Sequence, residues 1–461
     1  MVTLAALQKL QAFRSKLYGC CTRRRDARFE LVDALLTADS IPSLAYLSLE
    51  PVHRRGWGST YAALATGRWD AEALRTLLAR HQLAGGQPIY AVDVSTWPRC
   101  DAEASPERGF YYHPSRHSAG QPIVAAWAYQ WIAQLGFARN SWTAPVDARR
   151  LRPCDNANQV AVTQVRALLQ RLPAGQAPLF VFDAGYDPVQ LGQGLAGTGA
   201  AILVRLRAGR CFYADPPPAA PGRVGRPRRH GAKLDTDDPS SWPAPTAVHA
   251  SADGQFGTVV VAAWEGLHPK PQLHPTRGTK QPRPIVRGTL VRVQVSRIPA
   301  RTRPPKVLWL WWQGPGTPDL EVLWRAYVRR FDLEIVCTQV TKPCLGAAWC
   351  GGDHVADLHV AVGDHHPVDQ QLHQLAALLE AGLVKARSQL VQHLGHGLSD
   401  RAHLSQPLTL SGDLSLACQQ VRLLAGKALV LPLEAGQVDH LGQVGLQQPL
   451  PLAGHARPDA V

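Results

Sequence analysis

The stretch PLFVFDAGYD at residues 178–187 is the part of the sequence from which the fold of this chain is inferred. Apolar residues followed by an acid, a small residue and a glycine are typical of a fully buried strand that delivers a carboxylate, here Asp183, to its C-terminal end. The stretch PIYAVDVS at residues 88–95 has the same pattern and contains Asp93. Each acid alone also fits a simpler role, in which it ends a strand or caps a turn. Together the two predict strand-end aspartates that share a divalent metal ion.

The segments on either side of residue 183 alternate between strand and helix patterns. Residues 158–172 (NQVAVTQVRALLQRL) predict a helix, residues 187–195 a short helix, and residues 200–206 (AAILVRL) another buried strand. Upstream, residues 122–135 (PIVAAWAYQWIAQL) predict paired strands beside the Asp93 strand. This alternation is typical of an α/β sheet covered by helices.

Residues 1–85 have a helical pattern. Leu4, Leu7, Leu10 and Phe13 keep helical spacing, as do the apolar residues of 71–83 (AEALRTLLARHQL). Arginine clusters lie between these segments, so the region fits either a DNA-binding module or a solvated helical cap on the next domain. The pair Gly85-Gly86 marks a boundary after it.

Residues 207–305 are rich in Pro and Gly, and their apolar runs alternate. Residues 257–264 (GTVVVAAW) and 288–295 (GTLVRVQV) predict strands, so we interpret this region as a β-rich insertion. It contains a basic turn, GRPRRHG, with Arg226, Arg228 and Arg229. Such a turn is suited to phosphates or a minor groove, and it equally fits a solvated basic loop.

A third acid follows the insertion. Residues 306–312 (KVLWLWW) predict a strand, and a helix is expected from about Asp319. Its buried stripe is predicted to continue to Glu334 by way of Leu320, Leu323, Trp324, Tyr327 and Phe331. A carboxylate on an apolar face requires either a metal or a cation, and Arg330 one turn earlier is a candidate for the second.

The overall composition favours a polyanionic partner. The chain has 461 residues, which suggests several domains, and a formal net charge of +14, which favours nucleic acid. Its excess of Arg over Lys suits bidentate phosphate contacts or reflects a GC-rich genome. Nine irregularly spaced cysteines predict reduced thiols and a cytoplasmic protein. Without a signal-peptide core or a run of about 18 apolar residues, membrane insertion is not expected.

With these three acidic residues, the sequence resembles the DDE transposases of bacterial insertion sequences, which have a ribonuclease H-like catalytic domain. Three places carry the resemblance: Asp93 in AVDVSTWPR, Asp183 in FVFDAGYD, and YVRRFDLE at residues 327–334. The last fits the family pattern of Tyr, two residues, Arg, three residues and Glu. The closest group has a β-rich insertion between the second Asp and the Glu, and the resemblance covers roughly residues 1–334.

The resemblance implies a fold class and a domain plan. The fold is expected to be α/β, with a ribonuclease H-like mixed sheet flanked by helices. The expected parts are a helical module (1–85), the first part of the catalytic domain (86–206), the β-rich insertion (207–305), the last strand and Glu-bearing helix (306–342) and an atypical tail (343–461).

The resemblance also implies a chemistry. Asp93, Asp183 and Glu334 would hold two Mg²⁺ or Mn²⁺ ions for phosphodiester hydrolysis at transposon ends and strand transfer into target DNA. The partner would be double-stranded DNA, bound by a homodimer. Tyr327 and Arg330 are expected to contact the DNA backbone. Trp309, Trp311 and Trp312 would offer stacking surfaces for an unpaired base or belong to the sheet core, and we selected Trp311 as a DNA contact.

The match fails after Glu334. Lys342 is one position later than the family pattern expects, and Pro343 stops the helix. Residues 351–461 contain no aromatic residue and no Ile, and their net charge is −4. A tail of this composition suits disorder, or a frameshift that replaced the family's C-terminal helices. The alternatives to an active transposase are therefore an inactive remnant that only binds DNA and a nuclease without strand transfer.

Overall fold

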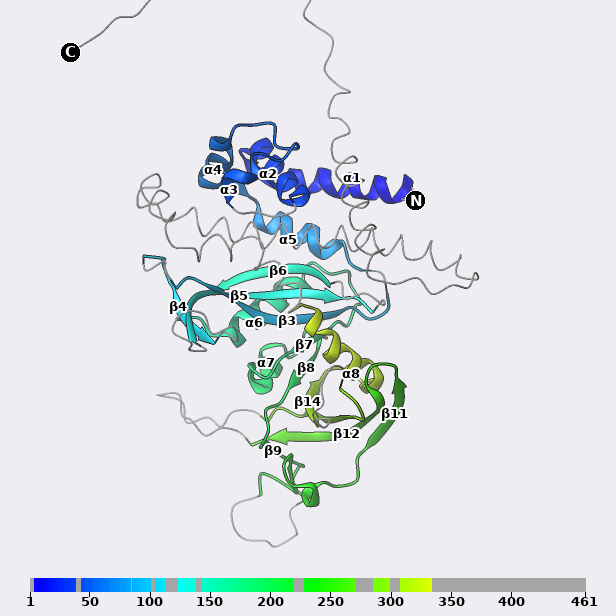
Figure 1. The fold of residues 1–461 in the computed structure, drawn as a ribbon. Coiled ribbons are helices and arrows are strands. Elements are labelled where there is room, and N and C mark those ends of the chain that lie inside the picture. Colours follow the sequence, from blue (N-terminus) through cyan, green and yellow to red (C-terminus); the bar gives the residue numbers. More distant parts are fainter. Residues whose placement is uncertain are drawn as a thin grey trace, which may run out of the picture. The chain divides into compact units, whose positions relative to one another are not determined.

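The computed structural model describes residues 4–38, 43–83, 85–100, 104–112, 123–137, 143–218, 228–270, 285–298 and 307–333 (Figure 1). The N-terminal region contains, in order, α1 (Leu4–Gly19), β1 (Cys21–Arg23), α2 (Arg25–Thr37), α3 (Leu44–Leu47), α4 (Trp57–Thr66), β2 (Arg68–Trp69) and α5 (Ala71–Arg80). The next elements are β3 (Ile89–Pro98), β4 (Gly109–Tyr112), β5 (Ile123–Leu135), β6 (Thr143–Leu151), α6 (Ala157–Leu169), β7 (Leu179–Phe182), α7 (Pro188–Gly194) and β8 (Ala201–Arg205). The last are β9 (Cys211–Tyr213), β10 (Lys233–Asp235), a 3₁₀ turn (Pro239–Ser241), β11 (Ala247–Asp253), β12 (Gly257–Pro269), β13 (Gly288–Val295), β14 (Leu308–Gln313) and α8 (Leu320–Arg329).

A large mixed sheet organises the chain. Its strand order is β10-β9-β12-β13-β14-β8-β7-β3-β5-β4, with β11 beside β12 and β6 beside β5. Among the described strands, β3, β7 and β8 run parallel to one another, and the remaining pairings are antiparallel. The order β6-β5-β3-β7-β8, with helices between the parallel strands, confirms the predicted α/β class, a ribonuclease H-like mixed sheet flanked by helices.

The three parallel strands are buried on both faces, which explains their continuous apolar runs. One face contributes the set Ile89, Ala91, Leu179, Val181, Ala201 and Leu203, and α8 packs on this side through Leu320, Leu323, Trp324 and Tyr327. The other face contributes Tyr90, Val92, Phe180, Phe182, Ile202 and Val204, which pack with residues of α6 and α7. Helices therefore cover both faces of the sheet where the parallel strands lie.

The stretch 122–135 differs from its prediction. Instead of paired strands it forms the single strand β5, which pairs with β3 on one side and with both β4 and β6 on the other. No Gly or Pro interrupts residues 123–135, so nothing in the sequence favours a turn there. Both faces are covered, and Gln130 and Gln134 are buried among its apolar residues.

The β-rich region extends this same sheet. The pairing of β13 with β14, and of β14 with β8, joins its strands to the parallel centre without a break. A separate apolar cluster, including Phe212, Trp264, Leu290 and Trp309, fills its interior. The strands expected at 257–264 and 288–295 are present, while the domain boundaries at 207 and 305 stay predictions.

The N-terminal helices expected within residues 1–85 are present, together with a small antiparallel pair, β1 and β2. Arg14 forms an ion pair with Asp33 at 2.5 Å inside this region, and Phe13, Leu17, Leu74 and Leu78 share an apolar cluster. No helix within the described residues is long and apolar enough to cross a membrane.

Candidate active site

Asp93 and Asp183 lie side by side on neighbouring parallel strands. The ladder aligns Val92 of β3 with Phe182 of β7, so the two aspartates occupy the next position on each strand. Adjacent strands are about 4.8 Å apart, which brings the carboxylates within reach of one cation. The strand-end prediction is exact for Asp183, which follows β7 directly, whereas Asp93 is inside the ten-residue strand β3.

Each carboxylate is held by its own loop or strand. Asp183 Oδ1 accepts a hydrogen bond from the Gly185 backbone N–H at 2.9 Å, and Asp93 Oδ1 accepts one from the Val94 N–H at 2.8 Å. Both side chains are half-buried. A Cβ at Gly185 would approach Asp183 Oδ1 to 3.1 Å, so a larger residue there would displace the carboxylate by a few tenths of an ångström. The local sequence thus orients both acids without using all of their oxygen lone pairs.

Arg330 supplies a cation to Asp93. Its Nη1 lies 2.5 Å from Asp93 Oδ2, and the two side chains are only 3% and 15% exposed. The guanidinium also lies 4.6 Å from the ring centroid of Phe331 and 5.7 Å from that of Tyr327. The sequence suggested Glu334 as the partner of Arg330, and Glu334 lies outside the described residues. The ion pair with Asp93 was not suggested by the sequence.

The helix was expected to keep its buried stripe through Phe331, but α8 ends at Arg329 and residue 330 is in a turn. Phe331 is 40% exposed, whereas Arg330 is 2% exposed and Leu333 is fully buried. The regular spacing of the stripe therefore stops where the helix ends, and Arg330 is turned inward to Asp93. Glu334 lies outside the described residues, so its role as the third ligand stays a prediction.

Tyr186 completes the neighbourhood of the carboxylates. Burial raises the pKa of its hydroxyl well above the ordinary value, the negative charges of Asp93 and Asp183 raise it further, and Arg330 opposes them. The Tyr186 side chain is 4% exposed, and its hydroxyl donates a hydrogen bond to Gln130 Oε1 at 3.1 Å. Sequence reasoning missed this residue, although its place three positions after Asp183 was a usable signal.

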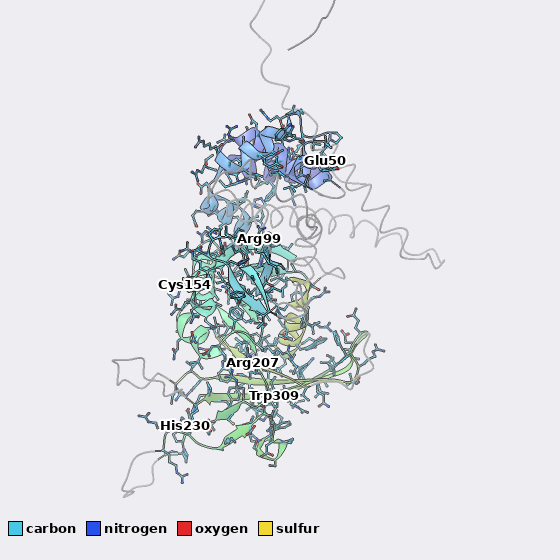
Figure 2. All side chains as sticks on the ribbon, turned by 60° about the vertical axis from the view of Figure 1, so that its left-hand side comes forward. Glu50, Arg99, Cys154, Arg207, His230 and Trp309 are labelled. Atoms are coloured by element: carbon cyan, nitrogen blue, oxygen red, sulfur yellow. The ribbon has the colours of Figure 1, made fainter. Side chains whose placement is uncertain are left out.

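Two exposed arginines lie at the C-terminal end of β8, Arg205 as its last residue and Arg207 two positions later. Arg207, labelled in Figure 2, donates from Nε to the Ala184 carbonyl at 3.1 Å, directly beside Asp183. Arg205 donates from Nη1 to the Tyr327 hydroxyl at 3.3 Å. Nothing in the sequence around Arg205 or Arg207 indicates this role, yet both place positive charge next to the carboxylate pair.

The other predicted DNA contacts are scattered. Arg228 and Arg229 are exposed, and Arg226 lies outside the described residues. Tyr327 and Arg330 are each only 2% exposed, so contact with DNA requires the end of α8 to move. Their role as DNA contacts stays a prediction.

The selection of Trp311 as a stacking surface is wrong for this structure. Its side chain is fully buried and stacks on Phe212 with ring centroids 5.1 Å apart. Trp309 and Trp312 are each 7% exposed. Alternate residues of β14 face opposite sides of a sheet that is covered on both, so all three indoles belong to the core.

Truncation of Trp311 is expected to destabilise the fold. Trp311→Ala should lower the free energy of unfolding by about 3–5 kcal/mol, because a large buried side chain is lost and a cavity remains. Chemical denaturation measures this, with Trp57→Ala as the control, since Trp57 is 66% exposed. If Trp311→Ala has the parental denaturation midpoint but binds DNA more weakly, Trp311 acts as a stacking surface and not as a core residue.

Glu321 anchors α8 to the sheet. Burial alone would raise its pKa, but hydrogen bonds from Trp324, Arg325, Ser251 and His249 outweigh burial and lower it to about 2. The partners on β11, His249 and Ser251, each lie 2.9 Å from Glu321 Oε2. This carboxylate therefore fixes the helix that carries Tyr327 and Arg330.

We expect Glu321 to make stability depend on pH. Because its pKa is lowered from 4.5 to about 2, its stabilisation is present above about pH 4.5 and is lost as the pH falls toward 2. Thermal unfolding should show Glu321→Gln less stable than the parent protein at pH 7, with a difference that shrinks below pH 4.5. Glu265→Gln, at an exposed position, should show no such convergence. A constant difference across this range would refute the interpretation.

The donor set fits a divalent cation. Two hard carboxylates at one sheet edge are the ligands that Mg²⁺ and Mn²⁺ prefer, and the Arg330 guanidinium already occupies a cation position at Asp93. Within the described ranges, which end at residue 333, no group of three or more His, Cys, Asp or Glu side chains could hold a metal. A complete site therefore needs a further ligand in addition to these two.

Comparison with known proteins gives the family. The model described as DDE superfamily endonuclease matches residues 16–270, a span that includes Asp93, Asp183 and Tyr186. No curated protein matches the chain. Among solved structures, a piggyBac transposase synaptic complex with hairpin DNA is similar at 11% identity and a TM-score of 0.36, over 83% of this chain and 67% of that one. Because the family match covers more than half of the sequence, the chain belongs to the DDE superfamily endonucleases.

Proposed function

We propose that this chain is a transposase-type DNA endonuclease that cuts phosphodiester bonds at the ends of its own element and joins a freed 3′ end to target DNA. The observation that carries the proposal is the pair of carboxylates on adjacent parallel strands, together with the Arg330 guanidinium that forms an ion pair with Asp93. The family assignment supports nuclease chemistry. The proposal includes joining of DNA ends by a homodimer. It also includes that the gene belongs to a bacterial insertion sequence and that the protein is located in the bacterial cytoplasm.

Asp93 and Asp183 are proposed to hold Mg²⁺ or Mn²⁺ together with Glu334. Such ions, when bound, activate the attacking oxygen and stabilise the leaving oxygen. Asp183 is kept in place for this by the Gly185 N–H, and Asp93 by the Val94 N–H. The fixed carboxylates reduce the reorganisation needed when the substrate binds.

Arg205 and Arg207 are proposed to contact the DNA backbone beside the cut. Both are exposed and positively charged, and Arg207 is tied to the loop of Asp183. Arg228 and Arg229 would bind phosphates farther from the carboxylates, in the β-rich region. Such contacts give affinity that falls as salt rises.

The test is cleavage and joining of a labelled duplex that carries the sequence flanking the gene, with Mg²⁺, Mn²⁺ or EDTA. Metal-dependent nicking followed by joining of the 3′ end to a plasmid supports the transposase. Nicking without joining supports a nuclease that lacks strand transfer. DNA binding without nicking supports an inactive remnant, which the unusual composition after Glu334 favours.

A further inference from the structure

A continuous series of buried hydrogen bonds connects the carboxylate neighbourhood with the N-terminal helical region. Five side chains form it, from five different elements or loops, and we call it the relay: Tyr186, Gln130, Gln164, Asp147 and Arg75. Gln130 and Gln164 are fully buried, and Tyr186 and Asp147 are each 4% exposed. The relay therefore crosses the core rather than the surface.

The donors in the relay all point toward Asp147. The Tyr186 hydroxyl donates to Gln130 Oε1 at 3.1 Å, Gln130 Nε2 donates to Gln164 Oε1 at 2.7 Å, and Gln164 Nε2 donates to Asp147 Oδ2 at 3.0 Å. From the other end, Arg75 Nε donates to Asp147 Oδ1 at 2.6 Å. Hydrogen bonds aligned toward a charge strengthen one another in a low-dielectric interior.

Such a network needs a reason, because polar groups in a core are costly when any partner is lost. An apolar residue at position 130 would fit the remainder of β5, whose neighbours at 131–133 are Trp, Ile and Ala and are buried. Replacement of buried polar groups by packed apolar ones is often neutral or stabilising. The relay therefore suggests a role in positioning rather than in stability.

The end of the relay at Tyr186 is placed to set the carboxylate geometry. Gln130 lies opposite Val94 in the ladder between β5 and β3, one residue from Asp93. Tyr186 is in the loop that begins with Asp183, and its backbone N–H bonds the Asp183 carbonyl at 3.4 Å. The hydrogen bond between Tyr186 and Gln130 thus ties the Asp183 loop to β5, the strand that pairs with the Asp93 strand β3.

The opposite end of the relay is in α5. Arg75 Nη1 also donates to Glu72 Oε1 at 2.6 Å, and Glu72 bonds Arg171, which follows α6. Asp147 has a second, weaker partner in Arg149, at 3.3 Å. A movement of α5 therefore changes the main counter-charge at one end of the relay.

We propose that Tyr186 and Gln130 are positioning residues for Asp183, and that the relay couples α5 to the carboxylate pair. The coupling rests on the proposed function, in which the carboxylates hold metal, and on the first of the two interpretations of residues 1–85 given above, a DNA-binding module. Binding of DNA against these helices would then be communicated to the metal-binding carboxylates through Asp147 and the two glutamines.

The test compares matched variants. Arg75→Met removes the relay's charged end and keeps an unbranched side chain of similar length. Arg14→Met is the control, because it removes a comparable ion pair, Arg14 with Asp33 at 2.5 Å, in the same helical region but outside the relay. Tyr186→Phe removes only the hydroxyl and keeps the ring against Phe182, whose centroid is 5.1 Å away.

Two readouts are used on the full chain. Mn²⁺ affinity, measured by calorimetry without DNA, should fall about tenfold in Tyr186→Phe and also in Arg75→Met, because residues that orient metal ligands have effects of this size. Amide hydrogen exchange of residues 183–187 should become faster in both. The double variant should be no worse than either single one, because the two changes break the same series of bonds.

Arg14→Met should leave both readouts at the parental value even if it lowers the unfolding midpoint. Equal effects of Arg75→Met and Arg14→Met, or additive effects in the double variant, would overturn the coupling. The parent protein could bind Mn²⁺ and cut DNA while Tyr186→Phe has the parental Mn²⁺ affinity and the parental amide exchange at residues 183–187. In that case the positioning role fails and the proposed function stands. If the parent binds no Mn²⁺, the proposed function fails, whereas faster exchange in Tyr186→Phe and Arg75→Met, but not in Arg14→Met, still supports the structural coupling.

Discussion

Asp183→Asn should reduce metal-dependent DNA cleavage by at least about a thousandfold, because loss of a charged metal ligand removes several kcal/mol of transition-state stabilisation. The substitution preserves shape, and Oδ1 of asparagine can still accept the Gly185 N–H that Oδ1 of Asp183 accepts at 2.9 Å. The folded structure should therefore persist. The measurement is the single-turnover rate on a labelled duplex with saturating Mn²⁺.

Asp93→Asn should have a similar effect on cleavage but a different effect on stability. This change removes the negative charge that faces Arg330, which is 3% exposed, so the variant should also unfold at a lower denaturant concentration. The Asp93→Asn/Asp183→Asn double variant should cut no more slowly than either single variant, because both acids serve one site. The matched control is Asp187→Asn, which alters the cap of α7 near the site. Residual activity above one tenth in Asp183→Asn would remove this residue from the catalytic site.

Arg330→Ala should have the second largest effect, a loss of stability whose size should depend on metal. Without metal the variant leaves the Asp93 carboxylate buried without its close cation, which should cost about 3–5 kcal/mol of unfolding free energy. A divalent ion can replace the lost positive charge. The rise in unfolding temperature on adding Mn²⁺ should therefore be larger in Arg330→Ala than in the parent protein.

Arg329→Ala is the matched control for this experiment. Arg329 is adjacent in sequence and forms an ion pair with Asp332 at 3.1 Å. It should lose stability to a similar extent with and without Mn²⁺. If Mn²⁺ raises the unfolding temperature equally in both variants, Arg330 does not act as a stand-in for the metal.

Local patterns predicted the centre of the sheet well. Residues 179–182 and 201–205 form β7 and β8 because continuous apolar runs suit strands that are buried on both faces. The start of α8 was predictable from Asp319, whose side chain accepts hydrogen bonds from the N–H groups of Glu321 and Val322. In each of these cases the information lies within a few consecutive residues.

The sequence could not show which side chains meet across the fold. Arg330 and Asp93 are 237 positions apart, and nothing near either residue indicates the pair. The same is true of Tyr186 and Gln130, which are 56 positions apart. Trp311 was expected to stack on a base but is buried in the core. An aromatic residue in a strand suits either role, and only the elements that pack on the two faces of the sheet distinguish them.

The sequence by itself determined the class of fold, the place of Asp183 at the end of a strand and the basic character that favours DNA, because periodicity, turn residues and net charge are local or additive properties. The tertiary structure decided that Arg330 is turned inward to Asp93, that Phe331 is left exposed, and that buried glutamines link α5 to Tyr186. These features depend on strand order and register, which bring distant residues to one edge of the sheet. Electrostatic pairing in a water-poor interior then determines which of those residues turn inward.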